Sequence, residues 1–210
     1  MTLIAVIDFE TTGLSPAMGS RATEVAIVLL GGGQVVDRFQ SLMNAGVHIP
    51  AFITSLTGIS NAMVAAAPAA DRVMQDAGRF VGHAPLVAHN AAFDRKFWQA
   101  ELALADEPAA HAFACTLLVS RRLYPHAPSH KLGVLVDYHD LPRAGRAHRA
   151  LADAEMAASL LGQIQDDLRT RHGVTRPDHS MLMTLQRCGK PKVRALMAQY
   201  AGAGAACVMP

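Results

Sequence analysis

The first ten residues place an aliphatic segment directly before two acids. Residues 3–7 read Leu-Ile-Ala-Val-Ile, and Asp8 and Glu10 follow them. A run of this kind is typical of a strand buried on both faces, so the rest of the chain must cover both sides of a sheet. Because side chains alternate along a strand, Asp8 and Glu10 point to the same side. Two like charges there repel each other unless a cation lies between them, and solvated loop acids are an equally weighted alternative.

Further segments supply the rest of an α/β domain. Three glycines at 31–33 separate the apolar runs 24–30 and 34–42, which predicts a hairpin. Short strands are expected at residues 86–88 and around residues 113–116. Helical spacing is present at residues 68–81, 93–104, 117–124, 130–138, 150–168 and 193–200. Strands that come first, with helices after them, indicate an α/β domain with a mixed sheet.

Composition narrows the class of protein. The chain has 210 residues, of which 51% are hydrophobic and 17% charged, which suits one domain with a large core and argues against disorder. A net charge of +2 is too small to indicate a protein that coats long nucleic acid, and it does not exclude a nucleic-acid partner.

The sequence offers little sign of a membrane segment, a signal peptide or a disulfide framework. No apolar run reaches the roughly 20 residues of a membrane helix, and the N-terminus does not resemble a signal peptide, so we expect no membrane partner. The three cysteines, Cys115, Cys188 and Cys207, lack the spacing of a zinc site or a disulfide framework. A reducing, cytoplasmic location fits this pattern best.

Two further acids follow predicted structural boundaries. Asp94 comes after the strand at residues 86–88, and its ordinary interpretation is an acid in the first turn of a helix capped by Asn90. Asp153 lies near the start of the helix predicted from residue 150, five positions after His148. On one helix these two side chains would be about 140° apart, so they share a site only if His148 lies on the preceding loop.

Taken together, three segments resemble the motifs of the DnaQ-like 3′-5′ exonucleases of the DEDDh type. Residues 6–14 contain D-F-E-T-T-G-L and resemble the first motif, D-x-E-T-T-G. Residues 86–94 resemble the second, an apolar strand followed by H-N-x-x-F-D, and residues 148–153 resemble the third, H-x-A-x-x-D. The motifs follow the family's order and spacing over residues 3–168. Cys115 stands where many relatives carry an aspartate, which lies outside the metal set.

The resemblance implies a ribonuclease-H-like fold, with a five-stranded mixed sheet flanked by helices, and two divalent metal ions. Two Mg²⁺ ions, with Mn²⁺ able to substitute, would be held by Asp8, Glu10, Asp94 and Asp153. Carboxylate oxygens suit these hard cations, which can stabilise the attacking water and the leaving 3′ oxygen of a phosphodiester. His148 would be the general base, since an ordinary imidazole is largely neutral near pH 7.

The resemblance also implies contacts with the 3′-terminal nucleotides. The residues expected to make them are Thr11, Thr12, Gly13, Leu14, Thr57, Asn90 and Phe93. Leu14 and Phe93 would pack against bases, and their alternative is an ordinary place in the core. An arginine set would track the phosphates or form a solvated basic face. Its members are Arg121, Arg122, Arg143, Arg146 and Arg149.

The motifs leave the substrate open. A proofreading epsilon subunit of a replicative DNA polymerase, a separate DNA exonuclease and an RNA-trimming exonuclease share them, and a non-catalytic nucleic-acid-binding module is an alternative of another class. The hairpin and the C-terminal segment favour the epsilon-like group, hence single-stranded or frayed DNA 3′ ends and a DNA polymerase subunit as partner. Residues 1–170 would form the exonuclease domain and residues 171–210 a helical extension and tail. We find no clamp-binding peptide in residues 171–210.

Overall fold

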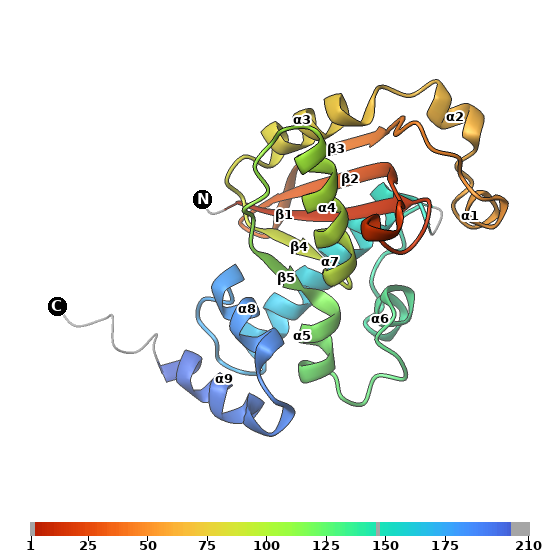
Figure 1. The fold of residues 1–210 in the computed structure, drawn as a ribbon. Coiled ribbons are helices and arrows are strands. Elements are labelled where there is room, and N and C mark those ends of the chain that lie inside the picture. The colour runs from red at the N-terminus through yellow and green to blue at the C-terminus, as the bar shows by residue number, and fades with distance from the viewer. Residues whose placement is uncertain (1–2, 146–147, 203–210) are drawn as a thin grey trace.

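The computed structural model describes residues 3–145 and 148–202, and its centre is a single sheet (Figure 1). The strands are β1 (Leu3–Thr11), β2 (Ala22–Gly31), β3 (Gln34–Leu42), β4 (Leu86–Ala88) and β5 (Phe113–Cys115). They are arranged in the order β3-β2-β1-β4-β5. β1, β2 and β3 are antiparallel neighbours, whereas β4 is parallel to β1 and β5 is parallel to β4. The predicted five-stranded mixed sheet and its hairpin are confirmed.

Helices follow the strands as the periodicity predicted. The α-helices of the described residues are α1 (Ala51–Thr57), α2 (Asn61–Ala65), α3 (Ala70–Val81), α4 (Ala92–Leu104), α5 (Thr116–Leu123), α6 (Leu132–Tyr138), α7 (Ala150–Thr170), α8 (His179–Arg187) and α9 (Val193–Gly202). Short 3₁₀ turns lie at Pro16–Met18 and Lys190–Lys192. The helices predicted from periodicity are all present, with ends shifted by a few residues.

The sheet is covered on both faces, as the aliphatic run of β1 requires. Alternate residues of β1 enter two separate hydrophobic clusters: Ile7 packs with Trp98 of α4 on one face, and Val6 packs with Leu161 of α7 on the other. Figure 1 accordingly shows α4 in front of the sheet and α7 behind it. The period of two along β1 therefore sorts its side chains between two cores.

β1 extends further than the sequence predicted. The aliphatic run ends at Ile7, but β1 pairs with β2 as far as Thr11, with an irregularity between Glu10 and Thr11. The backbone ladder tolerates acids at the end of a strand when their side chains leave the apolar layer. Asp8 and Glu10 therefore lie within the strand, and Glu10 is only 8% exposed, so the alternative of solvated loop acids is wrong.

The sequence analysis missed α8, which covers the outer edge of the sheet. Asp178 caps this helix by accepting a hydrogen bond from the Met181 N–H at 3.0 Å, and Met181 and Leu185 are buried. The Gln186 side chain accepts from the Cys115 N–H at 2.6 Å and so occupies the open edge of β5. An Asp cap followed by apolar residues four apart was the signal available in the sequence. The short helices α1 and α2 were also missed.

Three remaining expectations concern particular segments. In the part of the chain that the structure describes, no helix is both long and apolar enough to cross a membrane. Cys115 and Cys188 are free thiols. Cys207 and Arg146 lie outside the described residues.

Candidate active site

The two acids of β1 lie on one face of the sheet. In the pairing with β2, Asp8 is opposite Ala26 and Glu10 is opposite Glu24. Val6, two residues before Asp8, belongs to the core that contacts α7. Asp8 and Glu10 therefore continue this face beyond its apolar layer, as the period of a strand predicted.

Asp94 reaches the same edge of the sheet from α4. Because β4 is parallel to β1, the carboxyl ends of the two strands lie at one edge. Asp94 is 2% exposed, and its Oδ1 accepts a hydrogen bond from the Phe9 N–H at 3.3 Å. The N-cap of α4 is Ala91, without a side-chain capping bond, and Asn90 has a φ of 67°. The predicted Asn90 cap is therefore wrong, and Asp94 is buried against β1 although it lies in the first turn.

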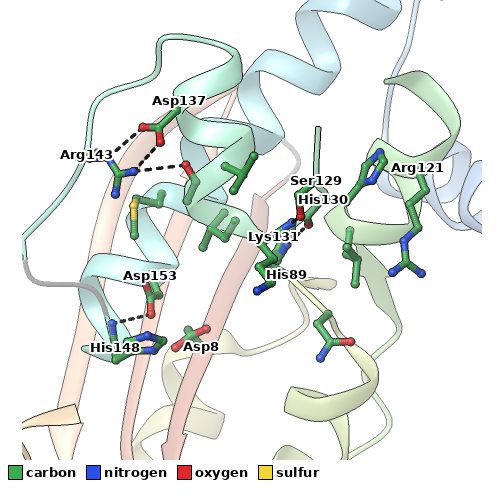
Figure 2. A pocket seen from close by; sticks show the side chains of 16 residues that line it. Asp8, His89, Arg121, Ser129, His130, Lys131, Asp137, Arg143, His148 and Asp153 are labelled. Carbon is green, nitrogen blue, oxygen red and sulfur yellow. Dashed lines mark hydrogen bonds and ion pairs between the residues drawn. The ribbon is translucent and has the colours of Figure 1, made fainter. Parts of the chain in front are cut away.

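His148 lies on the loop before α7, the position that a shared site with Asp153 requires. α7 begins at Ala150, and His148 adopts a left-handed backbone conformation with a φ of 60°. Its N–H donates a hydrogen bond to Asp153 Oδ2 at 3.1 Å, drawn as a dashed line in Figure 2. The turn thus brings His148 back beside the first turn of the helix.

Acidic and imidazole groups from three parts of the chain converge here. Glu10, His148 and Asp153 each offer a ligand atom, and these atoms lie within 4.8 Å of one another. Asp8 and Asp94 line the same hollow, whose volume is about 390 Å³. Within residues 3–145 and 148–202, none of the four carboxylates forms an ion pair with lysine or arginine.

Burial without a paired cation raises the pKa of these carboxyls. Burial, followed by repulsion from neighbouring acids with Asp94 foremost, raises the pKa of Asp8 well above its ordinary value. Burial and repulsion from Asp153 raise the pKa of Glu10 to about 8. Burial also raises the pKa of Asp94 to about 8, against the opposing effect of backbone hydrogen bonds. Divalent cations with oxygen preference, such as Mg²⁺ or Mn²⁺, fit such a donor set because they neutralise its repulsion.

One wall of the hollow is apolar. Leu14 is 82% exposed and Phe52 68% exposed, and both line the hollow together with Leu56 and Phe93. The alternative that Leu14 belongs to the core is therefore wrong. The sequence analysis missed Phe52, which lies four residues before Leu56 on α1, whereas Ile53 is buried. The signal available in the sequence was that Phe52 and Leu56 are four residues apart and therefore lie on the same face of a helix.

Small polar residues shape the turn after β1. The Thr11 hydroxyl donates to the Gly13 carbonyl at 2.7 Å, and the Arg21 N–H donates to Thr12 Oγ1 at 3.0 Å. A Cβ on Gly13 would lie 2.7 Å from Ser20 Oγ, so a larger residue here requires the Ser20 hydroxyl to rotate away. Thr11 and Gly13 line the hollow, whereas Thr12 does not.

Thr57 and Asn90, the remaining predicted nucleotide contacts, line two different cavities. Thr57 lines the hollow but is 1% exposed, and its hydroxyl donates to the Ile53 carbonyl at 3.0 Å. Asn90 lines a different groove. The structure thus brings Thr11, Gly13, Leu14, Thr57 and Phe93 to the carboxylates, and it leaves Thr12 and Asn90 outside that hollow.

The second groove, of about 1150 Å³, begins at the same carboxylates. It shares Asp8, His148 and Asp153 with the hollow and continues to Arg121 and Lys131. Figure 2 shows Arg121 across the groove from Asp8 and Asp153, with Lys131 between them. The site therefore has an apolar side and a cationic side that meet at the acids.

His89 lines both cavities. Its Nδ1 lies 2.9 Å from Thr116 Oγ1, and its Nε2 lies 3.0 Å from the His130 carbonyl oxygen. Burial lowers the pKa of His89 to about 4, so the ring is neutral at pH 7. With both nitrogens engaged, His89 supports the end of β4.

Most of the described arginines of the predicted set are engaged within the protein. Arg143 pairs with Asp137 at 2.7 Å, and Arg149 pairs with Glu24 at 2.8 Å. Arg122 donates to two backbone carbonyl oxygens, at 2.9 and 3.1 Å. Tertiary packing supplies these three with partners within the protein, and the expectation that the set tracks phosphates stays a prediction, since Arg143 is exposed and lines the second groove.

Comparison with known proteins agrees with this geometry. A family model described as an exonuclease matches residues 5–161. The chain is 36% identical over 165 residues to the 3′-5′ exonuclease DinG of Bacillus subtilis (strain 168), an alignment that covers 78% of this chain and 18% of DinG. It is 38% identical over 160 residues to a PolC-type DNA polymerase III of Oceanobacillus iheyensis, covering 76% of this chain and 11% of that protein. The chain thus spans less than a fifth of the length of these two relatives.

A solved structure provides a comparison over nearly a whole domain. Exonuclease X in complex with 5′ overhanging duplex DNA superimposes with a TM-score of 0.64 at 28% identity, covering 78% of this chain and 91% of that one. The ribonuclease-H-like fold class is thereby confirmed. The family match, the ordered motifs and the fold agree, and the chain belongs to the exonuclease family.

Proposed function

We propose that this chain is a two-metal-ion exonuclease that removes nucleotides from DNA 3′ ends and releases nucleoside 5′-monophosphates. The observation that carries the proposal is the convergence of four carboxylates, none of them in an ion pair with a described lysine or arginine, at the junction of an apolar hollow and a cationic groove. A nucleic-acid end needs these three features together, because it presents bases, phosphates and the bond to be broken.

The acids are the proposed metal ligands. Asp8, on β1, is near the other three, since the charges of Asp94, Asp153 and Glu10 all raise its pKa. When bound, two divalent ions would supply the charge that stabilises the attacking water and the leaving 3′ oxygen. Mg²⁺ is the proposed ion, with Mn²⁺ as a substitute, since both accept carboxylate and water oxygens.

His148 is the proposed general base. Its side chain is exposed to solvent at the rim of both cavities, where a water molecule can reach an imidazole nitrogen. Its backbone N–H is held by Asp153, so the base and a metal ligand keep a constant separation. A base in this place would take the proton of the attacking water.

The two cavities suggest how a strand lies in the site. The terminal bases would contact Leu14, Phe52 and Phe93, since apolar contacts accept any base. The phosphates would pass Arg121 and Lys131 in the groove, where neither side chain forms an ion pair among the described residues. Thr12 and Asn90 remain proposed contacts at the edges of the hollow.

DNA is the preferred substrate in this proposal. Two relatives are named as a DNA polymerase III and as DinG, and Exonuclease X was solved with duplex DNA bearing a 5′ overhang, hence a recessed 3′ end. An exoribonuclease of the same family is the alternative. A polymerase subunit as partner, a proofreading role, a cytoplasmic location and a domain boundary at residue 170 are further parts of the proposal, suggested by the PolC-type relatives and by the cysteine pattern.

Digestion of matched 5′-labelled DNA and RNA oligonucleotides tests the proposal. Single-stranded, recessed and mismatched 3′ ends are compared in Mg²⁺, in Mn²⁺ and in chelator. We expect a ladder that shortens by one nucleotide at a time, 5′-monophosphate products and faster cleavage of DNA. Internal cuts, 3′-phosphate products or full activity in chelator would contradict the proposal, and faster cleavage of RNA would reverse the substrate preference.

A further inference from the structure

A buried glutamate on β2 holds the backbone next to His148. Glu24 is fully buried and lies opposite Glu10 in the sheet. It does not line the hollow or the second groove, so it is not placed to contact a strand. Its contacts lie instead with the start of α7.

The Glu24 carboxylate accepts hydrogen bonds from three groups. Arg149 donates from Nη2 to Oε1 at 2.8 Å and from Nε to Oε2 at 3.1 Å. The Ala150 N–H also donates to Oε2, at 3.1 Å, and Gln40 donates to Oε1 at 2.8 Å. Burial alone would raise the pKa of Glu24, but these bonds lower it below its ordinary value, so the carboxylate is charged.

These bonds reach the residues that directly follow His148. A left-handed conformation at a residue other than glycine persists only where its surroundings determine it. Two attachments do so here: Asp153 accepts the His148 N–H, and Glu24 anchors both Arg149 and Ala150 to the central part of the sheet. Without the Glu24 bonds, the hydrogen bond from the His148 N–H to Asp153 would be the remaining one of these two attachments.

We propose that Glu24 is a positioning residue for His148, holding the imidazole where it meets the attacking water. The inference rests on the proposed function, in which His148 is the general base. Glu24 acts through the Arg149 and Ala150 bonds and touches neither metal nor strand.

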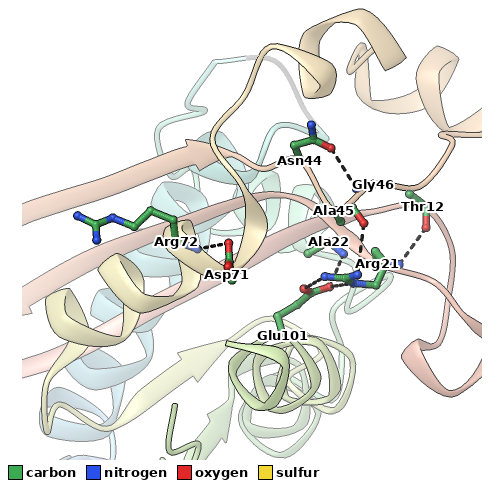
Figure 3. Close-up of polar contacts among 9 residues, drawn as sticks. All are labelled: Thr12, Arg21, Ala22, Asn44, Ala45, Gly46, Asp71, Arg72 and Glu101. Carbon is green, nitrogen blue, oxygen red and sulfur yellow. Dashed lines mark hydrogen bonds and ion pairs between the residues drawn. The ribbon is translucent and has the colours of Figure 1, made fainter. Parts of the chain in front are cut away.

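The chain contains a second pair of the same chemistry, which serves as a matched control. Glu101 is 2% exposed and accepts two bonds from Arg21, at 2.9 and 2.8 Å, and one from the Ala22 N–H at 2.9 Å (Figure 3). Arg21 is in turn bonded to Thr12, on the turn after β1. This pair holds the nucleotide side of the site, whereas the Glu24 pair holds the side of the base.

A double-mutant cycle separates the two roles. Glu24→Gln, Glu101→Gln, His148→Ala and the doubles of each glutamine variant with His148→Ala are compared by kcat, KM and calorimetric Mn²⁺ affinity. We expect Glu24→Gln to lower kcat by roughly 10- to 100-fold, as a misplaced base does, with KM and Mn²⁺ affinity nearly unchanged. In the His148→Ala background, Glu24→Gln should not lower kcat any further, because Glu24 acts on the reaction through His148.

The control should behave differently. Glu101→Gln should raise KM more than it lowers kcat, and by the same factor with or without His148. Amide hydrogen exchange at residues 148–150 should accelerate in Glu24→Gln and not in Glu101→Gln. If Glu24→Gln does not fold, Arg149→Lys keeps the charge, loses the two-point contact and should show the same dependence on His148.

Several outcomes would overturn the inference. An equal loss from Glu24→Gln in the His148→Ala background, or a large loss of Mn²⁺ affinity, would mean that Glu24 acts on the metals and not on the histidine. Those results would leave the proposed function intact. A wild-type rate for His148→Ala would overturn both the assigned base and its positioning.

Discussion

Buried carboxylates occur in two kinds at one end of this sheet. Glu24 and Glu101 each meet an arginine and a backbone N–H, at 2.8–3.1 Å. Asp8, Glu10 and Asp94 are close by in the fold, yet no arginine or lysine in the described residues forms an ion pair with them. We call the first kind the paired acids and the second the unpaired acids.

The pKa shifts of Glu24 and of the unpaired acids have opposite signs. Burial would raise the pKa of Glu24, but its hydrogen bonds outweigh burial and lower it. Burial raises the pKa of Glu10 and of Asp94 to about 8. Since Glu10 and Glu24 are directly opposite each other in the sheet, the difference comes from their partners and not from their depth. Paired acids therefore hold loops in place, and unpaired acids remain available for cations.

The largest expected effect follows from removing one unpaired acid. Asp8→Asn should reduce the exonuclease rate by about 1,000-fold or more, since charge stabilisation by metals contributes several kcal/mol. The same change should raise the melting temperature of the metal-free protein by relieving repulsion. Single-turnover rates and thermal melts in chelator measure the two quantities.

Glu101→Gln, which removes a paired acid, should change stability in the opposite direction from Asp8→Asn. Loss of a paired acid should lower the free energy of unfolding by about 3 kcal/mol in urea titrations, because a buried arginine contact is broken. Turnover at saturating substrate should be largely retained. If Asp8→Asn lowered stability and Glu101→Gln raised it, the division into two kinds would be wrong.

The next effect separates the base from the ligands. His148→Ala should lower turnover by roughly 100- to 10,000-fold while Mn²⁺ affinity stays nearly intact, because a general base is not needed to hold the ions. Asp153→Ala should weaken both turnover and Mn²⁺ binding. Calorimetric titrations beside single-turnover rates provide the measurement. An equal loss of Mn²⁺ affinity in both variants would make His148 a metal ligand instead.

Glu24 and the unpaired acids also predict opposite contributions to the pH dependence of the stability of the metal-free protein. Glu10 and Asp94 keep their protons up to about pH 8 when folded, whereas unfolded carboxyls lose theirs near pH 4. At these two acids the folded state then binds more protons, so their contribution to the free energy of unfolding should fall as pH rises from about 4 to 8. The contribution of Glu24 has the opposite sign and is lost as pH falls through its lowered pKa.

Urea titrations in chelator at several pH values measure this slope. Asp8→Asn should flatten it between about pH 5 and pH 8, because one source of repulsion is removed. Saturating Mg²⁺ should also flatten it. A slope that is the same in wild type and in Asp8→Asn would contradict the assignment of unpaired acids.

The smallest expected effect concerns the apolar wall beside the unpaired acids. Phe52→Ala should raise KM by roughly 5- to 50-fold, since an aromatic contact with a base contributes about 1–3 kcal/mol. Leu104→Ala is the control, because Leu104 is 60% exposed and does not line the hollow. Similar KM values for the two variants would show that α1 takes no part in holding the strand.

The sequence by itself determined the elements whose pattern is local. The aliphatic run of β1, the three glycines between β2 and β3, and the periodicity of α7 each depend on residues close together in the chain. The three motifs likewise located Asp8, Glu10, Asp94, His148 and Asp153, which line one hollow. Each of these residues alone had an ordinary interpretation, and the resemblance of the three motifs to a known family singled them out.

Only the tertiary structure decided the contacts between distant segments. Arg149 and Glu24 are 125 positions apart and Gln186 and Cys115 are 71 apart, so no local pattern links them. Phe52 reaches the hollow because α1 lies beside it, although nothing near Phe52 in sequence is acidic. Which acids are paired and which are unpaired depends on what packing brings within about 3 Å, and this is decided by the assembled sheet and helices.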